Sequence, residues 1–194
     1  MAEYKGIKGF KVQSLASDPT LVEGQVWYNT TGNVLKYQAL AAGSWAAGGT
    51  RSSYYSGAYS GTQTAGVYGS GTPGPTATTD IYDGTSWTTS PGSVNTARFH
   101  ITNAGCGTST AAQITGGEKT PYAILGNTEQ FDGTSWAEVN DMVTGRYTLV
   151  VGGTQAGAIG MTGYGPGVSA LVEEWDGTSW TAGTAAPTAT YYAA

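Results

Sequence analysis

The sequence is poor in charge, in metal-binding side chains and in long apolar runs. Charged residues make up 11% of the 194 residues, and there is one histidine, His100, and one cysteine, Cys106. A single cysteine cannot form an internal disulfide, so stability has to come from packing. No apolar run approaches the roughly 20 residues that span a bilayer, and no apolar stretch of a secretory signal follows Met1. We therefore expect no membrane insertion.

Positive charge is scarce over most of the chain. Residues 1–37 carry four lysines against three acids, a net charge of +1, whereas residues 38–194 carry four cations against ten acids, a net charge of −6. Nucleic-acid binding depends on clustered Lys and Arg that neutralise phosphates. We therefore expect no nucleic-acid partner.

Glycine and aromatic residues are abundant instead. The chain holds 31 Gly, 13 Tyr and 6 Trp. A shortage of Leu, Ile, Val and Phe is typical of disordered chains, but those also have high net charge and few rings. Here rings supply the apolar area, and no long stretch has the 3.6-residue period of an amphipathic helix. These features predict a turn-rich all-β protein with essentially no helix.

One motif recurs along the chain: an aromatic residue, then Asp-Gly-Thr-Ser, then Trp. Its copies lie at 82–87, 131–136 and 175–180, and a worn copy comprises Tyr37 and 43–45. Repeats of this length indicate supersecondary units that stack on one another. We single out the motif's tryptophans as packing rings and its aspartates as turn residues: Trp45, Trp87, Trp136, Trp180, Asp83, Asp132 and Asp176. Calcium ligation by these aspartates is the alternative, but Asp-Gly at a hairpin turn serves the backbone by itself.

Each full repeat predicts four short antiparallel strands. They are expected at 54–59, 66–69, 80–82 and 87–89, at 99–104, 111–115, 128–131 and 136–139, and at 147–151, 158–162, 169–175 and 180–182. A hairpin is expected at 25–29 and 34–38, with a third strand at 45–47. Four such strands in 40 to 50 residues form one propeller blade. The predicted order is a partial blade at 25–50, blades at 51–97, 98–145 and 146–190, and the start of a further strand at 191–194.

Three arginines open the repeats, and they are the only arginines of the chain. Arg51, Arg98 and Arg146 are spaced by 47 and 48 residues, and the fourth position would fall at Tyr191. A guanidinium buried between blades can donate several hydrogen bonds to carbonyls, and it can also stack on a ring. A structural role between blades is therefore expected for all three.

Residues 1–22 differ from the repeats, because lysines alternate there with apolar residues and glycines interrupt the pattern. The glycines disfavour a stable isolated helix, so we expect either an extended arm that orders against a partner or a frayed terminus. The docking hypothesis names six residues: Lys5, Lys8, Phe10, Lys11, Trp27 and Tyr28.

The repeats resemble kelch repeats over about residues 34–190. The resemblance rests on Gly-Gly pairs at strand ends, the aromatic-Asp turn, the later Trp, and Met142 and Arg146 before the next strand. It implies kelch-like β-propeller blades with the aromatic and Trp rings packed between them. Within the full repeats, Gly-Gly pairs stand at 116–117 and 152–153, and the first full repeat has none. Closure is expected either within the chain on four blades, in a dimeric ring, or in a longer protein.

Residues 23–37, Glu-Gly-Gln-Val-Trp-Tyr-Asn-Thr-Thr-Gly-Asn-Val-Leu-Lys-Tyr, resemble a segment of structural proteins of tailed phages of the marine type, particularly fibre and appendage proteins. The resemblance implies a virion structural protein, assembled in the host cytoplasm, whose partners are other virion proteins, further copies of itself and a host-surface glycan. The alternative is a kelch-type carbohydrate-binding or enzymatic domain of the galactose-oxidase kind.

Catalytic chemistry is not indicated by the remaining residues. His100 and Cys106 lie six apart with no clustered third ligand, and Glu173 and Glu174 point to opposite faces of one strand. Residues 69–74 match a dinucleotide fingerprint, but Pro73, Pro75 and the Thr78–Thr79 run exclude the required helix. We therefore expect no enzyme, no metal and no cofactor. Tyr54, Tyr55, Tyr59 and Tyr164 lie beside glycine turns, where rings either stack on sugars or belong to the core.

Overall fold

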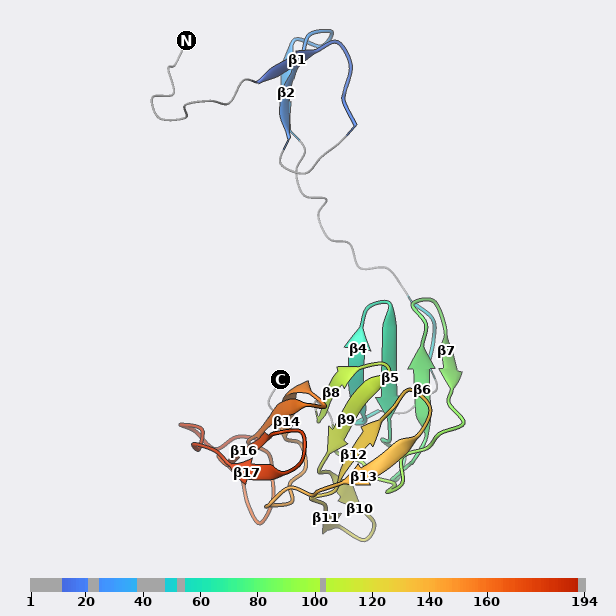
Figure 1. Cartoon of the computed structure of the whole chain (residues 1–194), viewed down its shortest axis with the longest axis vertical. Helices are drawn as coiled ribbons and strands as arrows, with labels where there is room; N and C mark the ends of the chain where they lie inside the picture. Colours follow the sequence, from blue (N-terminus) through green and yellow to red (C-terminus); the bar gives the residue numbers. More distant parts are fainter. Residues whose placement is uncertain (1–11, 21–24, 38–47, 52–54, 102–103, 192–194) are drawn as a thin grey trace. The chain divides into compact units, whose positions relative to one another are not determined.

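The computed structural model describes residues 12–20, 25–37, 48–51, 55–101 and 104–191 (Figure 1). The chain divides into two compact units, residues 1–47 and residues 48–194. The described residues form 17 strands and no helix, hence no helix that could cross a membrane. The predicted all-β class is therefore confirmed. The predictions for Lys5, Lys8, Phe10, Lys11, Trp45 and Tyr54 fall outside the described residues.

The first unit contains a three-stranded sheet. The predicted hairpin is present as β2 (Val26–Asn29) and β3 (Val34–Tyr37), and β1 (Gln13–Leu15) pairs with β2 in parallel. The end of the predicted arm and the hairpin thus share one sheet, and the compact unit ends at 47 rather than at 22. Residues 25–37 form the predicted antiparallel hairpin, and the third strand expected at 45–47 lies outside the described residues.

The second unit contains three four-stranded antiparallel sheets, one for each full repeat. Sheet I comprises β4 (Ala58–Thr62), β5 (Ala65–Gly69), β6 (Thr79–Tyr82) and β7 (Trp87–Thr89). Sheet II comprises β8 (Gly105–Thr108), β9 (Ala111–Thr115), β12 (Thr128–Phe131) and β13 (Trp136–Val139). Sheet III comprises β14 (Val150–Thr154), β15 (Gly157–Met161), β16 (Val172–Trp175) and β17 (Trp180–Ala182). A small hairpin, β10 (Glu118–Lys119) and β11 (Ala123–Ile124), precedes β12.

The second, third and fourth strands match the predicted positions to within one residue, except that β16 starts at Val172 instead of 169. The first strands begin later than predicted, by three to six residues. The reason is that the residues before them pair elsewhere: Tyr55 with Thr72, Phe99 with Glu118, and Tyr147 with Tyr164. These aromatic residues have strand propensity, but their partners lie past the ends of the second strands.

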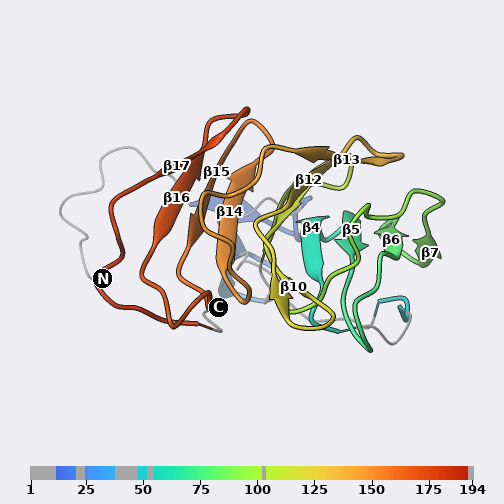
Figure 2. The ribbon, with the colours of Figure 1, turned by 90° about the horizontal axis from the view of Figure 1, so that it is seen from below.

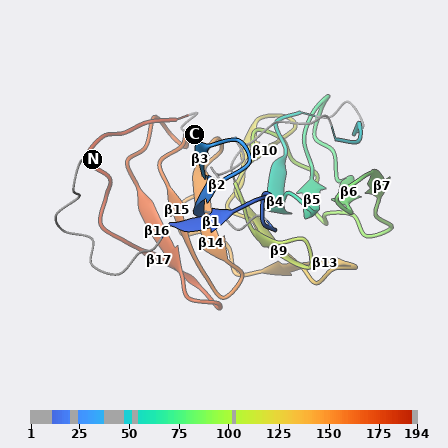
Figure 3. The ribbon, with the colours of Figure 1, turned by 90° about the horizontal axis from the view of Figure 1, so that it is seen from above.

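The first strands of the three sheets are neighbours, with β8 next to both β4 and β14. Figures 2 and 3 show the opposite strands β7, β13 and β17 at the outside of this unit. Side chains from all three sheets fill one core, among them Ala58, Ile114, Leu149 and Trp180. The described residues show three successive sheets and no closed ring.

The three repeats share one backbone conformation just after their second strands. Two consecutive residues have left-handed φ at Ser70-Gly71, Gly116-Gly117 and Thr162-Gly163, each pair 46 residues after the previous one. At Gly117 a Cβ atom would lie 2.4 Å from Ile101 Cγ2, so only glycine fits there. The Gly-Gly pair at 152–153 belongs to the end of a first strand and is not equivalent to 116–117.

Candidate functional site

The repeated aspartates hold hairpin turns. Oδ1 of Asp83 accepts hydrogen bonds from the amides of Thr85 and Ser86, both at 2.8 Å. The same two bonds, at the same distance, recur at Asp132 and Asp176. The glycine after each aspartate has φ between 94° and 97°. The motif therefore closes the turn between the third and fourth strands.

These local bonds also change the acidity of the aspartates. The amides of the following Ser and Thr lower the pKa of each carboxyl below its ordinary value of 3.8, because they stabilise the charged form. Among the described residues no group of three His, Cys, Asp or Glu side chains is placed to hold a metal ion.

Arg98 and Arg146 are fully buried. Arg98 donates from Nη1 to the carbonyls of Gly116 (3.0 Å) and Asn127 (2.8 Å), and from Nη2 to the Glu129 carboxylate. Arg146 repeats this pattern one sheet later, donating to the carbonyls of Thr162 (3.1 Å) and Leu171 (2.6 Å) and to Glu173 at 3.0 Å. We call each buried arginine with its acid a clamp.

The acid of each clamp also holds the loop that leads to the arginine. Glu129 accepts bonds from the amides of Asn95 (2.6 Å) and Thr96 (3.0 Å). Glu173 accepts from the amides of Val143 (2.7 Å) and Thr144 (3.2 Å). Both carboxylates thus receive the guanidinium and two amides, which offsets the cost of burying the charges.

The clamps join neighbouring sheets. The backbone of Arg98 pairs with Gly71 and Thr76 of the first repeat, while its side chain binds the third strand of sheet II. The backbone of Arg146 pairs likewise with Gly117 and Leu125, while its side chain binds sheet III. Thr190 makes the equivalent backbone bonds to Gly163 and Ser169. Thr190 therefore occupies the position that corresponds to Arg98 and Arg146 after the third repeat. The prediction had placed this position at Tyr191.

Arg51 occupies a variant of the clamp in sheet I. Its Nη1 lies 3.2 Å from Asp80 Oδ2, and its guanidinium carbon lies 3.7 Å from the centre of the Tyr68 ring. Both of the expected roles for the arginines, donation to carbonyls and stacking on a ring, therefore occur, but at different positions.

Sequence reasoning missed the acids of the clamps. Asp80, Glu129 and Glu173 each lie three residues before the turn aspartate of their repeat. The sequence contained one signal for them, because an acid stands at the same distance before the turn aspartate in every repeat. Its pairing with an arginine 27 to 31 residues earlier required the fold.

The repeat tryptophans pack from one sheet to the preceding one. Trp136 of sheet II donates from Nε1 to Thr79 Oγ1 of sheet I at 2.8 Å, and Trp180 of sheet III donates to Thr128 Oγ1 of sheet II at 2.9 Å. Both rings are buried. Trp87 is partly exposed and packs against Tyr59 and Tyr82 within its own sheet.

His100 and Cys106 have separate environments. His100 Nδ1 lies 2.9 Å from Glu118 Oε2, whereas Cys106 is buried in β8. Burial raises the pKa of the Cys106 thiol to about 11, because the thiolate is poorly solvated there. A thiol in this state is a poor nucleophile at neutral pH.

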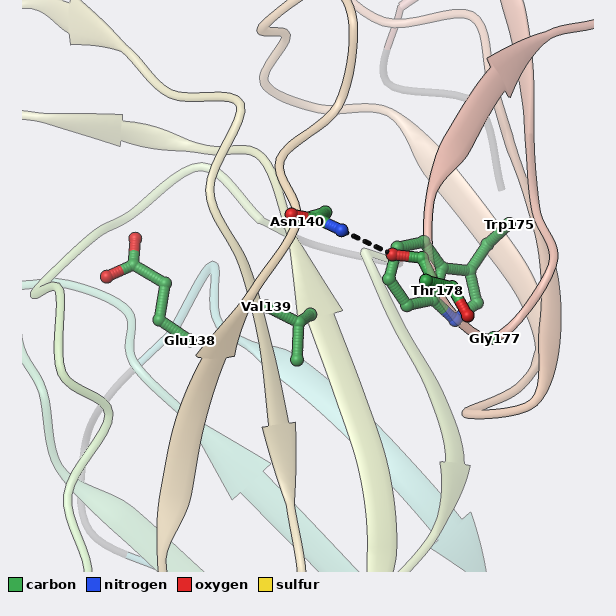
Figure 4. A pocket seen from close by; sticks show the side chains of 6 residues that line it. All are labelled: Glu138, Val139, Asn140, Trp175, Gly177 and Thr178. Atoms are coloured by element: carbon green, nitrogen blue, oxygen red, sulfur yellow. Dashed lines mark hydrogen bonds between the residues drawn. The ribbon is translucent and has the colours of Figure 1, made fainter.

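An open groove of about 440 Å³ lies between β13 and the turn of sheet III (Figure 4). Six residues line it: Glu138, Val139, Asn140, Trp175, Gly177 and Thr178. Asn140 crosses it and donates to the Thr178 carbonyl at 2.8 Å, while Glu138 points away from that bond. Glu138 is the only ionisable residue of the six, so the groove offers no acid–base pair.

The first unit has its own polar centre at Asp18. Its carboxylate accepts hydrogen bonds from the Trp27 indole (3.1 Å), from Asn29 Nδ2 (3.0 Å) and from Lys36 Nζ (2.7 Å). These bonds, that from Lys36 most of all, lower the pKa of Asp18. Of the two predicted docking residues that are described, Trp27 is buried and Tyr28 is partly exposed.

No protein-family model matches the chain, and no curated protein matches it significantly.

Proposed function

We propose that the chain is a structural protein of a tailed-phage virion, a fibre, appendage or adaptor component, in which residues 48–194 form kelch-like propeller blades. The blade proposal is supported by the one-to-one relation between the three repeats and the three four-stranded antiparallel sheets, whose first strands are neighbours. The phage proposal is supported by the resemblance of residues 23–37 to phage structural proteins.

The observation that supports a structural role is that the buried charged side chains bind other parts of the protein itself. Arg98, Arg146, Glu129 and Glu173 connect one sheet to the next. The turn aspartates are bonded to their own turns. Ionisable groups in an enzyme converge on one site and face a substrate, whereas these groups are spread along the repeats.

Docking to the particle is assigned to the first residues of the chain. Lys5, Lys8, Phe10 and Lys11 supply cationic and apolar contacts for another virion protein, whereas Trp27 is buried and bonded to Asp18 of its own unit.

Mass spectrometry of gradient-purified particles tests the proposal, which requires the protein in them at stoichiometric amounts. A phage that encodes the chain without residues 2–11 should produce particles that lack the protein. This deletion retains every described residue, unlike a deletion to residue 22, which would remove β1 and Asp18. The matched control replaces Tyr122, which is 84% exposed and lies outside the clamps, with Ser and should leave incorporation unchanged. A protein found only in the soluble fraction of the lysate would refute the proposal.

A further inference from the structure

Five rings contact one another in sequence outside the clamps and the turns. Their centres are separated by 4.4 Å between Phe99 and His100, 5.6 Å between His100 and Tyr147, 5.3 Å between Tyr147 and Tyr164, and 5.7 Å between Tyr164 and Tyr191. We call these five residues the ring row. It begins before β8 and ends after β17, so it crosses from the second repeat to the third.

The backbone holds the row in place. Phe99 pairs with Glu118 and Tyr147 pairs with Tyr164, each through two hydrogen bonds of 2.9 to 3.0 Å. The carboxylate of Glu118 orients the imidazole of His100. Thr148, which follows Tyr147, and Thr162, two residues before Tyr164, have φ of 50° and 57°, a conformation that β-branched residues rarely adopt. Thr162 belongs to the left-handed pair that recurs after each second strand, so the repeat geometry itself positions Tyr164 in the row.

The row is only partly buried, unlike Trp136 and Trp180. The side chain of His100 is 33% exposed and Tyr191 is 46% exposed, whereas Trp136 and Trp180 are 6% and 4% exposed. Phe99, Tyr147 and Tyr164 have intermediate exposure. An aromatic ring with one buried side and one solvent-exposed edge is suited to a ligand that has both apolar faces and polar groups.

We propose that the ring row is a binding platform for a neutral glycan chain. The C–H faces of sugar rings pack on the aromatic faces, and sugar hydroxyls bond to the polar edges of the row. Bases of single-stranded nucleic acid also stack on rings, but their backbone requires a cationic groove. Glu118 places a carboxylate against the row, and the guanidiniums of Arg98 and Arg146 are buried in the clamps. Lys119 is exposed beside Glu118, but a single lysine does not make a cationic groove. This inference rests on the proposed function, because it identifies the host-surface contact as a glycan.

Full-length protein on an array of neutral oligosaccharides tests the proposal, with sulfated and sialylated glycans and oligo-dT as further probes. We expect neutral glycans to bind best. In titration calorimetry with the best of them, Tyr164→Ala should weaken binding roughly tenfold or more, because a stacking contact is lost. Tyr164→Phe keeps the ring and should stay within about threefold. The matched control is Tyr122→Ala, which removes a ring that is 84% exposed and lies outside the row.

A variant that fails to fold is recognised by circular dichroism, and Tyr191→Ala, at the exposed end of the row, then takes the place of Tyr164→Ala with the same expectation. The proposal is overturned if no neutral glycan binds, if oligo-dT or an anionic glycan binds better, or if Tyr122→Ala weakens binding as much as the row variants. Presence in virions is measured separately, so a particle protein that binds no glycan refutes this inference and leaves the proposed function intact.

Discussion

Sheets II and III differ from sheet I in how they hold their arginine. Arg98 and Arg146 have no exposed side-chain surface, and the glutamates opposite them reach two loop amides as well. The side chain of Arg51 is 14% exposed, its acid is the shorter Asp80, and its guanidinium lies over Tyr68. In register, Tyr68 of sheet I corresponds to Ile114 and Gly160 of the other sheets.

The comparison shows that one repeat position can support two kinds of packing. A longer acid beside a smaller neighbour allows the guanidinium to be buried and to join two sheets. A shorter acid beside a tyrosine leaves it as a cation stacked on a ring, a contact worth less when it is partly solvated.

The largest expected effect comes from breaking a buried clamp. Glu129→Ala leaves Arg98 buried without its acid and removes the acceptor for Asn95 and Thr96, so unfolding free energy should fall by about 3–5 kcal/mol. Asp80→Ala in sheet I should cost about 1–2 kcal/mol. Urea denaturation of both variants measures the difference. Equal losses would show that the two arginine sites are energetically alike.

The tryptophan contacts between sheets should have the next largest effect. Thr128→Val removes the acceptor of the Trp180 indole and also the hydroxyl partner of Thr115, so it should cost about 1–3 kcal/mol. Thr181→Val changes an exposed residue of β17 and should stay within about 0.5 kcal/mol. The same denaturation experiment decides this point. If Thr128→Val is as mild as its control, the indole bond does not stabilise the contact between the sheets.

The turn aspartates should behave alike in all three sheets, in contrast to the clamps. Their folded pKa values lie below 3.8, so they stabilise the fold above that pH, and this contribution is lost as pH falls through and below 3.8. Single Asp→Asn changes at 83, 132 and 176 should each flatten the acid limb of a plot of melting temperature against pH by a similar small amount. A change confined to one sheet would contradict the equivalence of the turns.

The smallest effect is a change in labelling rate at Cys106. The buried thiol, with its pKa raised to about 11, should react slowly with a disulfide reagent at pH 8 in the native protein and fully in urea. Because Cys106 lies in sheet II, Glu129→Ala should accelerate labelling more than Asp80→Ala. Rapid labelling of the native wild-type protein would show that sheet II opens readily without any change to its clamp.

The fold could be predicted where the signal was local. Ring content, turn residues and the 44- to 49-residue repeat predicted the all-β class and most strands of the three sheets, because hairpins depend on neighbouring residues. The first strands were placed too early because Tyr55, Phe99 and Tyr147 pair with residues 17 to 19 positions later, a choice that strand propensity does not contain.

The sequence alone determined how many repeats there are, where each turns, and that few charges would have to be buried. Only the tertiary structure decided which charges meet. Arg98 is 31 residues from Glu129 along the chain, and its backbone pairs with the first repeat while its side chain binds sheet II. It also separated the Gly-Gly pairs into two kinds, joined the end of the arm to the hairpin through β1, and aligned five rings between Phe99 and Tyr191. The physical reason is that burial and pairing depend on three-dimensional neighbours, whereas turns and periodicity depend on adjacent residues.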